Sequence, residues 1–207
     1  MLHKLFLTTA VLAMCTLAQA SDTDWSWRFN GAYFGTRTAA VDGFDALDQR
    51  ISQAAATYCG TYHERNLAGW AGDTGFYATD LRAPMPLVPG QSKTWTFFLW
   101  EDPAWNIVLE LGWGWNSAAT PAFNKMTYVL TYVRAAEGIA GGPAVGTSAI
   151  LNQQQQGTWS FPVYKTTDGR TGYMFTLTAT VIPESSSLAA ILAGLAGLGA
   201  VVRRRRR

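Results

Sequence analysis

Residues 94–100 read TWTFFLW, and residues 126–134 read MTYVLTYVR. The first stretch alternates Trp95, Phe97 and Leu99 against Thr94 and Thr96, and the second alternates long side chains with threonine and valine. A period of two, together with enrichment in aromatic and β-branched residues, is the pattern of a β-strand with one buried face. These two stretches therefore predict a sheet whose inner face packs on an apolar core.

The same pattern extends over the middle of the chain. It predicts further strands at residues 25–34, 75–81, 105–113, 145–151, 158–164 and 173–182. Turn-forming residues separate them at 101–103, 116–121, 138–143, 152–157 and 167–169. No strand alternates with a helix, so an α/β fold is excluded. We expect residues 21–182 to form one immunoglobulin-like antiparallel β-sandwich of about eight strands.

Several local features refine this expectation. Residues 166–170 predict a tight hairpin with Asp168 and Gly169 at its apex, and the glutamine run at 153–156 predicts a polar hairpin loop. The one candidate helix before the C-terminal segment is 44–57. We expect Trp95, Trp105 and Trp113 to face the core, because sandwich interiors use tryptophan at inward positions.

The first 20 residues have the composition of a secretory signal peptide. Lys4 supplies the positive charge, residues 5–17 form an apolar segment, and Ala18-Gln19-Ala20 is a small-residue cleavage site. Cleavage there leaves Ser21 as the new N-terminus. A lipoprotein reading through Cys15 is disfavoured, because Met14 stands where a small residue is needed.

The last 26 residues, IPESSSLAAILAGLAGLGAVVRRRRR, have three parts in a fixed order. Pro183, Glu184 and Ser185 form a short polar motif. Residues 188–202 are uncharged and would span roughly 22 Å as a helix, against about 30 Å of hydrocarbon. Five arginines end the chain: Arg203, Arg204, Arg205, Arg206 and Arg207. An apolar helix followed by arginines stops translocation and leaves the arginines in the cytoplasm.

This arrangement resembles the PEP-CTERM sorting signal of Gram-negative bacteria, in which a Pro-Glu-Pro-like tripeptide precedes a short membrane helix and an arginine cluster. Pro183 and Glu184 match the tripeptide, and Ser185 stands where the family has proline. The resemblance implies cleavage near residues 183–185 by an exosortase-like membrane enzyme. It also implies delivery to the cell surface or the extracellular polysaccharide matrix. The alternative is an ordinary tail anchor.

Removing both signals reverses the sign of the charge. Residues 21–184 carry ten basic and 14 acidic side chains, a net charge of −4, whereas the full chain carries +2. No basic patch remains that resembles a nucleic-acid interface, so nucleic acid is excluded as a partner. Cys59 is the one cysteine after Ser21, so an intrachain disulfide is excluded there. We expect a buried free thiol.

Aromatic residues offer one candidate binding function. All nine tryptophans lie after Ser21, and Trp70 and Trp115 fall in predicted loops. Exposed tryptophan rings can stack on sugar rings, so these two are candidate carbohydrate-binding residues. The alternative is that they pack in the core like the other tryptophans.

Acidic residues offer two further candidates, each with a simpler interpretation. Asp42, Asp45 and Asp48 lack the alternating spacing of a calcium loop, and acids near a helix N-terminus explain them equally well. Glu101, Asp102 and Glu110 are the carboxylates that a small glycoside hydrolase would use, although solvated charges also account for them.

Catalytic and cofactor motifs are otherwise missing from the sequence. His63, the one histidine after Ser21, has no second His or Cys ligand near it in sequence, so neither zinc nor a Ser-His-Asp triad is indicated. We predict no metal, no cofactor and no catalytic residue. The expectation is an exported, non-catalytic sandwich with signal peptidase, an exosortase-like enzyme, the membrane and exopolysaccharide as partners. A carbohydrate-binding module and a carboxylate-dependent hydrolase are the alternatives.

Overall fold

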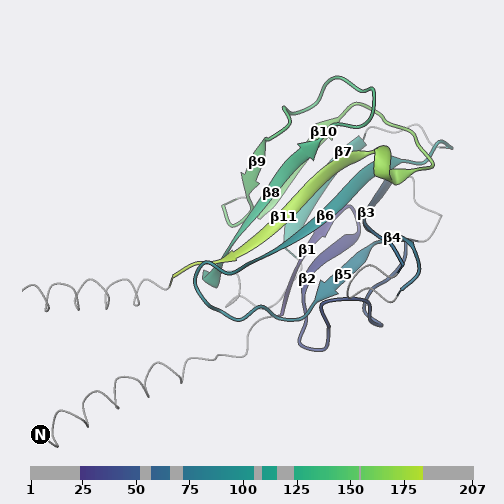
Figure 1. The fold of residues 1–207 in the computed structure, drawn as a ribbon. Coiled ribbons are helices and arrows are strands. Elements are labelled where there is room, and N and C mark those ends of the chain that lie inside the picture. Colours follow the sequence, from purple (N-terminus) through teal and green to yellow (C-terminus); the bar gives the residue numbers. More distant parts are fainter. Residues whose placement is uncertain are drawn as a thin grey trace, which may run out of the picture.

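The computed structural model describes residues 24–51, 57–65, 72–104, 109–115, 124–153 and 155–183. These residues form two β-sheets that pack face to face, as a sandwich (Figure 1). The prediction of a mainly β, sandwich-like fold is confirmed.

The five-stranded sheet has the order β10-β7-β1-β2-β5. Its members are β1 (Trp25–Phe29), β2 (Ala32–Thr36), β5 (Thr79–Arg82), β7 (Leu109–Trp115) and β10 (Gln156–Phe161). Neighbours run antiparallel except for β2 and β5, which are parallel. This sheet lies behind the other in the view of Figure 1.

The six-stranded sheet has the order β4-β3-β6-β11-β8-β9. Its members are β3 (Thr57–His63), β4 (Gly75–Tyr77), β6 (Ser92–Glu101), β8 (Met126–Arg134), β9 (Ser148–Ile150) and β11 (Tyr173–Val181). β11, the last strand in sequence, lies in the middle and pairs with both β6 and β8. The strands predicted at 94–100, 126–134 and 173–182 are confirmed, with small changes at their ends.

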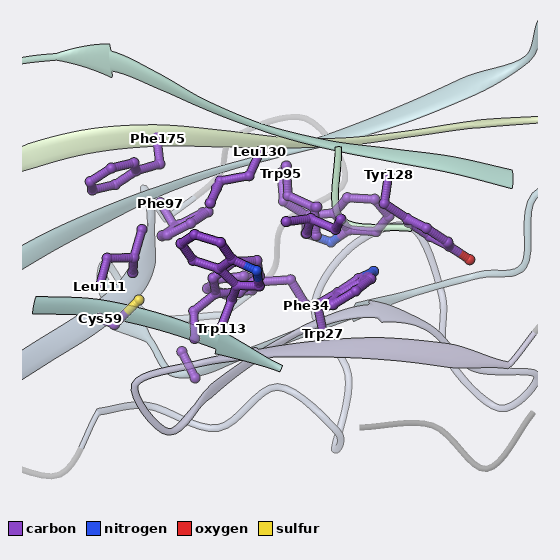
Figure 2. Packing of buried hydrophobic residues seen from close by; sticks show 14 of the residues in the cluster. Trp27, Phe34, Cys59, Trp95, Phe97, Leu111, Trp113, Tyr128, Leu130 and Phe175 are labelled. Atoms are coloured by element: carbon purple, nitrogen blue, oxygen red, sulfur yellow. The ribbon is translucent and has the colours of Figure 1, made fainter. Parts of the chain in front are cut away.

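Side chains from both sheets meet in one aromatic core, part of which is shown in Figure 2. Trp25 lies edge-on to Trp95 at 5.2 Å and to Tyr128 at 4.8 Å between ring centroids. Phe97 and Phe175 stack at 5.4 Å. Trp95 and Trp113 are buried, as predicted, whereas Trp105 lies outside the described residues.

Cys59 on β3 is a buried free thiol, as predicted. Only 4% of the residue is exposed, and desolvation raises the pKa of the thiol well above its usual range. The thiolate is therefore disfavoured, and the side chain acts as a small apolar residue of the core.

Two predicted strands are each divided in the structure. The stretch 25–34 forms the hairpin β1–β2, whose turn is Asn30 (φ 45°) and Gly31 (φ 90°). Positive φ at both central residues is the geometry that Asn-Gly favours in a two-residue hairpin. The stretch 75–81 divides at Ala78 into β4 and β5, which belong to different sheets.

The helix predicted at 44–57 is wrong. Residues 44–51 contain turns and bends, 52–56 lie outside the described residues, and 57–63 form β3. Aspartate side chains bind the backbone amides here: Asp45 accepts from Val41 N (2.9 Å) and Leu47 N (2.7 Å), and Asp48 accepts from Asp45 N (2.9 Å). Such local bonds compete with helical hydrogen bonds.

The two hairpins predicted from glycine and glutamine turns are also wrong. β10 belongs to the five-stranded sheet, whereas β9 and β11 belong to the other, so the segments at 152–157 and 166–170 cross between sheets. A short 3-10 turn, Gly169–Thr171, begins after Asp168, whose carboxylate accepts from Arg170 N at 3.1 Å.

Both predicted targeting segments lie outside the described residues. These are the signal peptide at 1–20 with its cleavage site Ala18, Ala20 and Ser21, and the C-terminal residues Glu184, Ser185, 188–202 and Arg203 to Arg207. Within the described part of the chain, no helix has the length and apolar character needed to cross a membrane.

Candidate functional site

Pro183, the first residue of the predicted sorting motif, lies immediately outside the sandwich. β11 ends at Val181, which pairs with Met126, and Ile182 N donates to Lys125 O at 3.0 Å. Pro183 is exposed. Ile182 is therefore the one residue between the end of β11 and Pro183.

The first strand begins at the same end of the sandwich as β11 finishes. The Trp25 ring lies 4.8 Å from that of Tyr128, and Tyr128 pairs with Ala179 near the end of β11. Asp24 fixes this entry by accepting from Thr38 N at 2.6 Å and Thr38 Oγ1 at 2.8 Å. The chain therefore enters and leaves the sandwich at one pole.

Trp115 is the last residue of β7 and does not lie in a loop as predicted. Its ring lies edge-on to Trp27 at 5.1 Å and tilted against Tyr128 at 5.6 Å. It is half-buried at the rim of the core. Trp70, the other predicted carbohydrate-binding residue, lies outside the described residues.

The carboxylates considered for a hydrolase do not converge. Glu101 is buried at the end of β6. Asp102 accepts from Tyr58 OH at 3.0 Å and from Ala104 N at 2.8 Å. Glu110 is on the outer face of the other sheet, where Ser160 Oγ donates to it at 3.3 Å. The three acids therefore do not face a common cleft, as a pair of glycosidase carboxylates must.

The three aspartates considered for calcium also point to separate partners. Asp42 forms an ion pair with Lys93, and Asp45 and Asp48 accept hydrogen bonds from backbone amides. Among the described residues, no group of three or more His, Cys, Asp or Glu side chains is placed to hold a metal ion.

The structure brings together a buried polar network that the sequence analysis missed. Asp80 on β5, 2% exposed, accepts from Arg82 Nε and Nη2 at 3.0 Å each, and lies 3.3 Å from His63 Nε2. The Arg82 guanidinium also lies over the Trp95 ring at 4.9 Å. Asp80 and His63 belong to different sheets, so the network joins the two layers at one edge.

The pKa values of two carboxylates in this region are shifted in opposite directions. Burial raises the pKa of Asp80, but the hydrogen bonds and charges of His63 and Arg82 outweigh it, so the pKa lies below its usual value. Burial, followed by repulsion from Asp80 and Asp45, raises the pKa of Asp48 to about 6 despite amide hydrogen bonds from Asp45 and Leu81. Asp48 is therefore harder to ionise in the folded chain than in the unfolded chain.

Asp48 should make the protein less stable as the pH rises from its unfolded pKa near 4 through its folded pKa of about 6. A carboxyl group whose folded pKa exceeds its unfolded value opposes folding once it ionises. We expect the free energy of unfolding to fall by about 1–2 kcal/mol between pH 4 and pH 7, because the roughly 3 kcal/mol that a rise of the pKa from near 4 to about 6 implies is reduced for solvent access at the sandwich edge. Urea denaturation of wild type and Asp48→Asn checks this, because the variant should lack that part of the fall. Parallel pH profiles for the two proteins would contradict it.

A cleft of about 680 Å³ opens beside the ends of β3 and β6. Its aromatic wall is Trp100, which stacks on Tyr58 at 5.2 Å and lies 4.4 Å from the Phe76 ring. Trp100 is only 6% exposed, so its ring faces are covered by protein. The cleft also contains Arg50 and Asp102, which already bind Thr74 O and Tyr58 OH.

A second, more polar hollow of about 500 Å³ crosses the outer face of the five-stranded sheet. Gly112 and Gly114 of β7 form its floor, with Gln156 and Thr158 of β10 on one side and Arg28 of β1 on the other. The sequence GWGW at 112–115 contains both glycines, but their neighbours on β1 and β10 come from distant parts of the chain.

Comparisons with known proteins do not assign the chain to a family. No protein-family model, no curated protein and no solved structure matches it.

Proposed function

We propose that the chain is an exported, non-catalytic β-sandwich protein that is sorted by its C-terminal tail. In this proposal residues 188–202 and the arginines 203–207 arrest the chain in the membrane. An exosortase-like enzyme then releases it near Pro183, Glu184 and Ser185, and signal peptidase trims it after Ala20. The product belongs at the cell surface or in an exopolysaccharide matrix.

The position of Pro183 carries this proposal. The motif begins one residue after Ile182, which the backbone still holds through Lys125, and Pro183 itself is exposed. A folded sandwich would therefore stand directly against the membrane while its tail remained inserted. An enzyme acting at the membrane surface reaches the motif there without unfolding β11.

The shared pole of entry and exit supports the same proposal. Trp25 follows the proposed new N-terminus by four residues, and Trp25 lies beside the strand pair that leads to Pro183. Both targeting segments would then leave the sandwich toward the same membrane. The rest of the surface would remain free to face the exterior.

We also propose that the sandwich is immunoglobulin-like. An immunoglobulin-like sandwich is consistent with two antiparallel-rich sheets around one aromatic core. No described feature favours the tryptophan platform or the hydrolase. The Trp115 ring packs against Trp27, and Glu101, Asp102 and Glu110 face different surroundings.

Processing in the native host tests the sorting proposal. The wild-type product should be recovered outside the cell with Ser21 at one end and no terminal arginines, as measured by intact mass. Glu184→Ala should accumulate in the membrane fraction with its tail attached, and extracellular product should fall severalfold. Replacing Arg203 to Arg207 with serine should remove the membrane intermediate, because the stop to translocation is lost.

Glu137→Ala is the matched control, since Glu137 is an exposed glutamate far from the tail in sequence. It should be processed like the wild type. Recovery of the wild type in the cytosol, or outside the cell with all five arginines, would refute the proposal.

A further inference from the structure

The hollow on the five-stranded sheet has a floor without side chains. The outward residues of β7 alternate with the buried Leu111 and Trp113, and two of them are Gly112 and Gly114. A Cβ added to Gly114 would meet no atom within 4 Å, and one added to Gly112 would first meet Asn30 Oδ1 at 3.4 Å. A Cβ would fit at either position without a clash, yet both positions are glycine. The result is a trough floored by the backbone of β7.

The walls of the trough are held in place by the sheet and by one asparagine. Gln156 and Thr158 of β10 pair with Gly114 and Gly112, and Arg28 of β1 pairs with Gly114 from the other side. Gly112 N donates to Asn30 Oδ1 at 2.8 Å, while Asn30 Nδ2 donates to Glu110 O. Both hydrogen bonds of the Asn30 side chain therefore go to the backbone of β7, which holds this side chain at one end of the trough.

Polar groups along the trough have free hydrogen-bonding capacity. Within the described part of the chain, the side chains of Arg28, Gln156 and Thr158 make no hydrogen bond or ion pair. All three are exposed. Together they present a guanidinium, an amide and a hydroxyl to whatever occupies the trough.

These dimensions and groups define the chemistry of an occupant. β1 and β10 lie on either side of β7, so the walls stand roughly 10 Å apart. This width admits one slim extended chain. The lining donates and accepts hydrogen bonds, which suits a ligand rich in hydroxyl groups. The unpaired guanidinium of Arg28 suits a carboxylate, which it can bind through two parallel hydrogen bonds.

We propose that this trough binds an extended polysaccharide bearing uronic acids. A sugar carboxylate lies on Arg28, and hydroxyl groups of the chain bind Gln156 and Thr158. Glu110 lies four residues along β7 from Gly114, roughly 13 Å away. Its carboxylate accepts sugar hydroxyls and disfavours a second acid there, which sets the direction of the chain.

Binding to polygalacturonate tests the proposal, with dextran as the neutral polysaccharide. The full chain, purified in mild detergent, should bind polygalacturonate and not dextran in isothermal titration calorimetry. Binding should weaken as salt rises, because exposed charges are screened. Arg28→Gln should weaken binding about tenfold or more, the scale of one charge-assisted contact. Gly114→Val should abolish it by filling the floor, since valine suits a strand and a Cβ at this position meets no atom within 4 Å.

Arg65→Gln is the matched control, because it removes one exposed arginine outside the trough and should bind like the wild type. Circular dichroism melting should show that each variant is folded, and Gln156→Leu provides a second lining variant if Gly114→Val is not. Equal binding of dextran, no binding by the wild type, or unchanged binding in Arg28→Gln would overturn the proposal. The test uses no tail processing, so its result is independent of the sorting proposal.

Discussion

Asp80→Ala is expected to destabilise the protein by roughly 3–5 kcal/mol, the scale for breaking a buried charge network on one side. Asp80 is 2% exposed and binds Arg82 through two hydrogen bonds, so the alanine variant would leave a cation without its partner beside Trp95. His63 would lose the same acceptor. Urea denaturation at pH 7 measures the change in the free energy of unfolding.

The control for Asp80 is Asp73→Ala. Asp73 forms an ion pair with Arg50 at 3.9 Å, but the two side chains are 70% and 56% exposed. Such surface pairs contribute about 0–1 kcal/mol. Because the folded pKa of Asp80 is lowered, its contribution is present above the unfolded value near 4 and is lost as the pH falls through the folded pKa. The difference between wild type and Asp80→Ala should therefore shrink in acid. Equal losses of unfolding free energy in Asp80→Ala and Asp73→Ala would contradict a stabilising role for the network.

Trp95→Ala is expected to destabilise the protein by about 3–5 kcal/mol, as measured for large-to-small changes of buried aromatic residues. The Trp95 ring is fully buried between the sheets, lies edge-on to Trp25 at 5.2 Å, and donates from Nε1 to Asp80 O at 3.1 Å. The variant would lose the ring packing and the hydrogen bond from Nε1 to Asp80 O. Thermal and urea unfolding, followed by tryptophan fluorescence and circular dichroism, measure the loss.

Trp115→Ala provides the comparison for Trp95. Trp115 packs on Trp27 at the rim of the core and is half-buried. Removing its ring therefore loses less buried apolar area than removing the ring of Trp95. Its loss should be clearly smaller than that of Trp95. A larger loss of stability in Trp115→Ala than in Trp95→Ala would contradict the assignment of Trp95 to the centre of the core.

The central strands could be predicted because each carries its own evidence. β8 and β11 alternate buried and partly exposed residues along almost their whole length, and β6 alternates from Trp95 to Leu99, so periodicity alone locates them. The division of 25–34 was missed, although Asn30-Gly31 is a strong hairpin signal, because aromatic residues continue on both sides of it. β3 was missed because buried Cys59, Gly60 and Thr61 follow one another without alternation.

The assignment of strands to sheets could not be predicted from local patterns. A glycine-rich turn looks the same whether the chain folds back into one sheet or crosses to the other, as the segments before β10 and β11 do. The polar network was missed for a related reason. His63 and Asp80 are 17 residues apart and meet because β3 and β5 lie at one edge of the sandwich.

The place of β11 has a consequence for when the molecule can fold. The last strand to be synthesised lies between β6 and β8, so the six-stranded sheet cannot close until nearly the whole sandwich sequence has emerged. Pairings between distant segments make such a topology slow to form. Until β11 arrives, the facing edges of β6 and β8 expose unpaired backbone groups that invite association with other chains. We therefore expect a chain that lacks β11 to aggregate more readily than the full chain.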